Sequence, residues 1–221
     1  MKQNNFNILF CLFFLSLWSS SALPTFAQRL DISNQPLSAN SPLSGTRQLS
    51  LNQKTKLIQM DASIVLAFKK FLKAIEKESI KAYQPLMRAI PLVKSKKGTK
   101  AEFITLLGQV QGDIKKLEEA LRAYEIYKNL NPSLHTSISL THKDWIQILV
   151  FRQEALALQK LYITSNKPKY LAEKKTQTLK AKALVKKASE RLNKTLKGIK
   201  TEAERLKRIL KVKALKEQKQ K

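Results

Sequence analysis

The sequence has one cysteine, five glycines and few acidic residues in a chain of 221. The cysteine, Cys11, lies in an apolar N-terminal run, so the rest of the chain has no thiol to form a disulfide or to ligate a metal. No stretch alternates apolar and polar residues over the length of a strand, which argues against a β-sheet. Only 16 Asp and Glu accompany 42 Lys and Arg, for a formal net charge of +26. A strongly basic, helical protein without covalent cross-links is therefore expected.

The first residues have the pattern of a secretory signal. Lys2 precedes an uncharged apolar run at residues 8–18, and small residues, Thr25 and Ala27, stand at the two positions that signal peptidase reads if it cuts after Ala27. An uncleaved anchor is the alternative, but about 11 residues rising 1.5 Å each span only about half of a 30 Å hydrocarbon core. We therefore expect residues 1–27 to be a cleaved signal peptide. The protein would then be exported, periplasmic or secreted, and not an integral membrane protein after cleavage.

The remaining chain divides into a polar leader and a helical part. Residues 28–48 are rich in serine, asparagine and proline, a composition typical of a flexible segment. After them, apolar residues recur at alternating spacings of three and four, as in amphipathic helices. We expect an all-α protein in which an up-and-down helical bundle over residues 49–166 is continued by a long basic, coiled-coil-like helix over residues 167–221.

Proline and capping signals predict the limits of the first two helices. A helix is expected over residues 52–84, because Pro85 disfavours helical geometry before it and clashes one turn back. Thr99 and Glu102 have the spacing of a capping box, which begins the next helix. That helix has a regular apolar seam and is expected to end before Pro132.

Two further helices are expected in the second half of the chain. Thr141 and Asp144 have the spacing of another cap, so a helix is expected over residues 142–164. Apolar residues lie nearly all round it, which predicts a central, buried position. The last helix, over residues 169–216, is too long for a compact bundle. We expect it to project from the bundle or to pair with another helix, including that of a second copy.

The basic excess is concentrated at the C-terminal end. Residues 167–221 hold 20 Lys and Arg against five Glu, a net charge of +15, whereas residues 28–166 carry +10. A helix with so many like charges attracts a polyanion, although lysines that merely solvate a bundle would give the same composition. The candidate anion-binding residues are Lys174, Lys175, Lys186, Lys187, Lys194, Lys197, Lys200, Arg205, Lys207, Arg208 and Lys211.

An anionic component of the cell envelope, lipid head groups or a polymer, is the expected partner. Nucleic acid is less favoured, because no recognition motif is present, Tyr170 is the only aromatic residue of the basic helix, and export removes the usual ligand. The alternative is a periplasmic chaperone or assembly factor that holds client proteins. It would bind them through apolar helix seams, in the last helix at Leu192, Leu196, Ile199 and Leu206.

The sequence contains no constellation typical of catalysis. His135 and His142 lie on either side of an expected helix boundary, without the cysteine or carboxylate spacing of a metal site. The turn around Gly98 lacks the earlier glycine and the strand of a phosphate-binding loop. Asp61 and Arg152 fall on apolar helix faces, where each marks either a buried polar partner or a seam edge exposed to water. We expect a protein that is not an enzyme and that has no cofactor or metal.

Overall fold

The computed structural model describes residues 49–95, 98–127 and 130–219. These ranges belong to one compact unit, Leu49–Lys221, and hold four α-helices and no strand. The helices are α2 (Leu51–Lys94), α3 (Lys100–Arg122), α4 (Pro132–Ser165) and α5 (Pro168–Lys219). The expected all-α bundle is confirmed. The expected signal peptide and leader lie outside the described residues.

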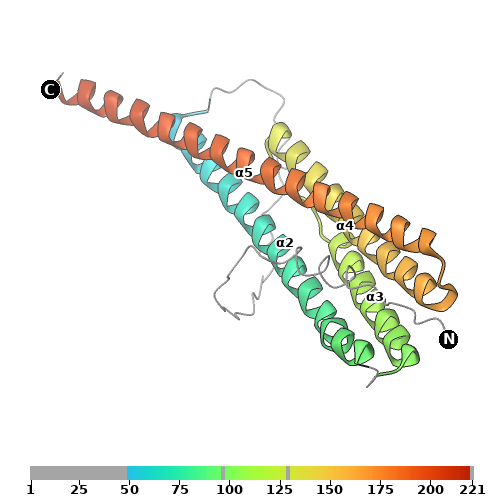
Figure 1. Ribbon diagram of the computed structural model, residues 1–221. Coiled ribbons are helices and arrows are strands. Elements are labelled where there is room, and N and C mark those ends of the chain that lie inside the picture. Colours follow the sequence, from blue (N-terminus) through green and yellow to red (C-terminus); the bar gives the residue numbers. More distant parts are fainter. Residues whose placement is uncertain (1–48, 96–97, 128–129, 220–221) are drawn as a thin grey trace, which may run out of the picture. The chain divides into compact units, whose positions relative to one another are not determined.

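The helices of this unit run alternately up and down, and each contacts the next (Figure 1). In addition, α5 packs against α2, and α2 touches α4 across the bundle. Among the described residues α3 and α5 make no contact with each other. The helices α2 and α4 therefore form the central diagonal, and α3 and α5 flank it.

The core lies along that diagonal. α2 contributes Val65, Phe68 and Leu72, and α4 contributes Ile148 and Leu149, all of which are buried. These residues recur at helical spacing, so burying one of them places the others on the same side. Further buried side chains come from the flanking helices: Phe103, Leu107, Val110, Ile114 and Leu121 of α3, and Ala181, Ala188, Leu192 and Leu206 of α5.

The first helix continues through both of its prolines. We expected Pro85 to end or kink it. The proline does not end the helix, because α2 includes Pro85 and Pro91 and ends beside Ser95, whose amide donates to the carbonyl of Pro91. Leu86 and Ile90, which lie between the prolines, are buried. Burial of these side chains holds the last turns in place, although each proline removes a backbone hydrogen bond.

The boundary between α3 and α4 also differs from the expectation. α3 begins at the predicted capping box but ends at Arg122, well before Pro132. Pro132 begins α4 in place of ending α3, with Asn131 as its N-cap. Proline suits the first turn of a helix because an amide there has no intrahelical partner. Thr141 is therefore not a cap: it is buried inside α4 and donates to the carbonyl of Ser137.

The last helix belongs to the bundle over most of its length. Its buried residues extend from Ala181 to Leu206, and the side chains at residues 211–216 are exposed. Alanines at positions 181 and 188 let α5 lie close to α4, but they give a weak hydrophobic signal in the sequence. Removing residues 167–221 would therefore expose to solvent the face of α4 that packs against α5.

The burial pattern predicts unequal effects for two leucines of α4. Leu149 is 0% exposed, and Leu161 is 45% exposed. Leu149→Ala should lower the free energy of unfolding by about 3 kcal/mol, because it removes core contacts and leaves a cavity. Leu161→Ala should change it by less than about 0.5 kcal/mol. Urea denaturation of both variants measures the difference, and equal losses would contradict the packing of α4.

Candidate anion-binding surface

The outer face of α5 carries almost all the predicted anion-binding residues. Because Ala181, Ala188 and Leu192 take the inner face of the helix, side chains about half a turn away must point to solvent. We call the predicted anion-binding residues that are exposed the outer face of α5: Lys175, Lys186, Lys187, Lys194, Lys197, Lys200, Arg205, Lys207, Arg208 and Lys211.

Few acidic groups oppose this charge. Lys186 lies 4.0 Å from Glu190, and Arg205 lies 3.3 Å from Glu202. Both pairs are exposed and join residues one turn apart, so each contributes little and leaves the cation accessible. Residues 205–216 hold six Lys and Arg and no Asp or Glu. The positive potential is therefore greatest toward the C-terminal end of α5.

Lys174 differs from the other candidates. It is half-buried between α4 and α5, and its Nζ donates to Oε1 of Gln159 at 2.7 Å. Burial lowers the pKa of Lys174 to about 8. The spacing could have shown this, because Lys174 precedes Ala181 and Ala188 by whole heptads and so lies on the inner face.

Two further polar contacts hold α5 on α4. Arg191 donates to Asp144 at 2.6 Å, with both side chains largely buried, and the hydroxyls of Ser137 and Thr195 lie 2.6 Å apart. Arg191 is basic but neutralised in the interface, so it does not belong to the outer face. Together with Lys174 these pairs fix the register of the two antiparallel helices.

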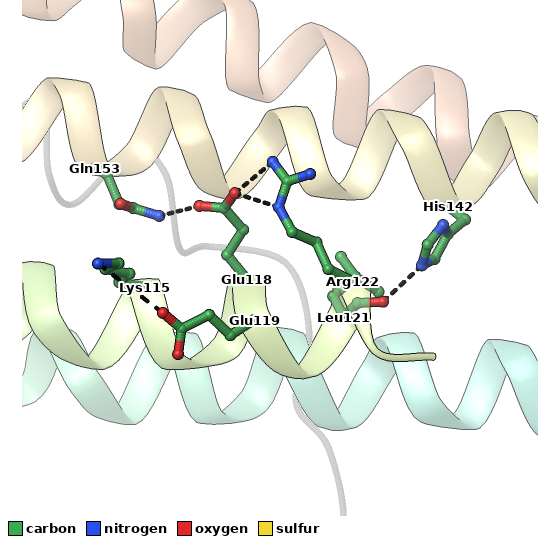
Figure 2. A network of polar contacts seen from close by, with 7 residues as sticks. All are labelled: Lys115, Glu118, Glu119, Leu121, Arg122, His142 and Gln153. Atoms are coloured by element: carbon green, nitrogen blue, oxygen red, sulfur yellow. Dashed lines mark hydrogen bonds and ion pairs between the residues drawn. The ribbon is translucent and has the colours of Figure 1, made fainter. Parts of the chain in front are cut away.

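A second polar cluster joins α3 to α4 (Figure 2). The carboxylate of Glu118 accepts from Arg122, at 2.6 Å, and from the side-chain amide of Gln153. Nε2 of His142 lies 2.6 Å from the carbonyl oxygen of Leu121 at the C-terminal end of α3, and this oxygen also accepts from the backbone amide of Tyr124 at 3.1 Å. The polar groups of this cluster are hydrogen-bond partners of one another, and they hold the C-terminal end of α3 against α4. This favours a structural role for the cluster.

The isolated polar residues singled out in the sequence have different surroundings. Arg152 donates to Oγ of Ser79 at 2.7 Å between α4 and α2. Burial raises the pKa of nearby Tyr83 to about 12, although the charge of Arg152 opposes that shift. Arg152 is half-buried, so it is a polar partner between α4 and α2 and not a fully buried one. Asp61 is half-buried, and desolvation raises the pKa of its carboxyl.

No charged cluster typical of a metal centre accompanies these residues. His135 and His142 both lie in α4, two turns apart, which is too far for a shared metal ion. Within residues 49–95, 98–127 and 130–219, no three His, Cys, Asp or Glu side chains come together in a way that could hold a metal. Over the same ranges, none of the helices combines the length and apolarity needed to cross a bilayer.

Comparison with known proteins does not assign the chain to a family. No protein-family model, curated protein or solved structure matches the chain. The class of protein therefore follows from the fold alone: an all-helical bundle in which one helix presents a long, exposed basic face.

The interface position of Lys174 predicts an unusual titration. Its pKa of about 8 in the folded chain lies below the ordinary value of 10.5, so folding disfavours the charged form. This cost is full below pH 8, where both states carry the ammonium charge. It falls as pH rises from 8 to 10.5, because the folded chain has already released the proton that the unfolded chain still binds, and it is absent above 10.5, where both states are neutral.

Carbon-13 NMR of the chain labelled at the lysine side chains should show a signal of Lys174 with a midpoint near pH 8. The Lys174→Met variant should lack that signal. If the signal lost in this variant titrates above pH 10, Lys174 is not in the interface.

Proposed function

We propose that this protein is an exported, non-catalytic helical protein that binds an anionic surface or polymer of the cell envelope through the outer face of α5. The observation that supports the proposal is the contrast between the two faces of this helix. One face is buried against α4 and α2, and the other is exposed, basic and sparsely paired. The basic residues of the outer face therefore form a stripe along one accessible side of α5.

The length of the stripe favours an extended partner. From Lys175 to Lys211 the helix rises about 54 Å at 1.5 Å per residue. A small anion would meet only one or two of these side chains, whereas a polymer or a lipid surface can meet many at once. Each contact that neutralises an anion releases counterions, so the total affinity grows with the number of contacts and falls with salt.

The client-binding alternative has less support. It requires the apolar seam of the last helix to be free, but Leu192 and Leu206 are buried in the bundle, and Leu196 and Ile199 are half-buried. A client could reach them only if α5 left α4, which would break the Asp144–Arg191 pair and expose core residues. The outer face requires no such opening.

Charge reversal on the outer face tests the proposal. The variant Lys194→Glu, Lys197→Glu, Lys200→Glu should bind heparin and vesicles rich in phosphatidylglycerol at least about tenfold more weakly at 50 mM salt, and its affinity should depend less on salt. Its melting temperature should change little, because all three side chains are exposed. Binding is measured by sedimentation with vesicles and by retention on a heparin column.

A matched control distinguishes a binding site on the outer face of α5 from a general effect of the net charge of the protein. Lys70→Glu, Lys73→Glu, Lys77→Glu makes the same change in charge at exposed positions of α2. This control should retain most of the binding. Equal losses in the two variants, or no binding of the unaltered protein to either ligand, would refute the role of the outer face.

A further inference from the structure

Of the described helices, only α2 and α5 reach one end of the bundle. The pairing of Ser137 with Thr195 in antiparallel helices places Pro132, the first residue of α4, beside about Lys200 of α5. Beyond that level the beginning of α2 is the only described helix beside α5, because α3 has already ended at Arg122. We call residues 51–61 of α2 and 201–216 of α5 the distal pair. In Figure 1, α5 runs on past the first turns of α2.

Large apolar side chains are exposed on the distal pair. Two helices can bury only the faces that they turn toward each other, and Leu206 is buried in this way. On α5, Val212 is 54% exposed and Leu215 is 49% exposed. The exposed apolar residues of the distal pair are Leu57, Met60, Ile209, Val212 and Leu215.

Basic side chains surround these apolar residues. Lys54 and Lys56 of α2 are exposed. On α5 the exposed cations Lys207, Arg208, Lys211, Lys213 and Lys216 alternate with the aliphatic residues. A soluble polyanion could neutralise the cations, but it would leave the aliphatic side chains in water. An anionic bilayer offers charged head groups and an apolar phase a few ångströms below them, and so matches both.

We propose that the distal pair docks on an anionic lipid bilayer. Its lysines and arginines contact the head groups, and Ile209, Val212 and Leu215 enter the boundary between head groups and acyl chains. Lysine stems also extend along the apolar layer while their ammonium groups remain in water. This inference rests on the proposed function of α5 and identifies lipid as the source of the anionic groups.

A second copy of the chain is a poorer occupant of this patch. Pairing two distal ends would bring two clusters of like charge together, because each distal pair holds eight Lys and Arg against three acidic residues, Asp61, Glu202 and Glu204. A lipid surface of opposite charge incurs no such repulsion.

Serine substitution of two exposed apolar residues of the distal pair tests the inference. The protein is prepared from residue 28 onward, so that the apolar run at residues 8–18 does not itself bind lipid; every buried core residue of the described chain is retained. The double variant Val212→Ser, Leu215→Ser should bind phosphatidylglycerol vesicles at least about tenfold more weakly and should bind heparin as before. Leu179→Ser is the matched control, because Leu179 lies on α5 outside the distal pair and is 50% exposed.

The outcomes separate this inference from the proposed function. Unchanged vesicle binding in the double variant, with heparin binding intact, would overturn docking by the distal pair and leave the proposed function standing. Failure of the unaltered protein to bind either ligand would overturn both. If the double variant converts a dimer into a monomer on gel filtration and still binds vesicles, a second copy covers the patch and the inference is wrong. Strong binding to vesicles of neutral phosphatidylcholine alone would also contradict it.

Discussion

The packing of α5 against α4 determines which residues of the chain can meet a partner. Alanines at positions 181 and 188 allow close approach, and the polar pairs Asp144–Arg191 and Gln159–Lys174 fix the register. Because a helix turns every 3.6 residues, fixing one face toward α4 fixes the opposite face toward solvent. The long basic stripe is therefore a consequence of the core and not an independent feature.

This arrangement connects binding with stability. The last helix carries like charges along its length, and their mutual repulsion opposes the compact state. The apolar contacts of its inner face must offset that repulsion. A polyanion or an anionic bilayer that neutralises the outer face would bind the folded chain preferentially, because only the folded chain presents the lysines as one stripe. Such a partner would raise the free energy of unfolding by mass action.

Local signals in the sequence predicted local structure well. The capping box of Thr99 and Glu102 and most of the apolar seam of α3 are present, since both depend on neighbouring residues alone. Pro85 and Thr141 were misread because burial in the bundle outweighs their local preferences: α2 continues through the proline, and the threonine lies inside α4. The charge of the last helix was evident, but its place in the bundle was not, because alanine contributes little to a hydrophobic pattern.

The candidate surface was predictable to a similar degree. The exposed lysines followed from composition and helical spacing. The exposed aliphatic residues at the C-terminal end did not, because their exposure depends on where α2 and α4 begin relative to α5, and among the described helices neither covers that end fully. Lys174 shows the reverse case, in which a residue that looks like part of a basic stripe lies in an interface. The exposure of the C-terminal end depends on where the other helices begin, whereas the position of Lys174 follows from its heptad spacing to Ala181 and Ala188.

Hydrogen exchange of the native chain tests the central claim, that α5 is at once part of the core and the carrier of the basic surface. Amides of α5 up to Leu206 should exchange as slowly as those in the middle of α4, because only unfolding of the bundle exposes them. Amides at residues 211–216, where all side chains are exposed, should exchange much faster. If all amides of α5 exchange as fast as those at residues 211–216 while the amides of α4 remain protected, the last helix is not held by the bundle and the account is wrong.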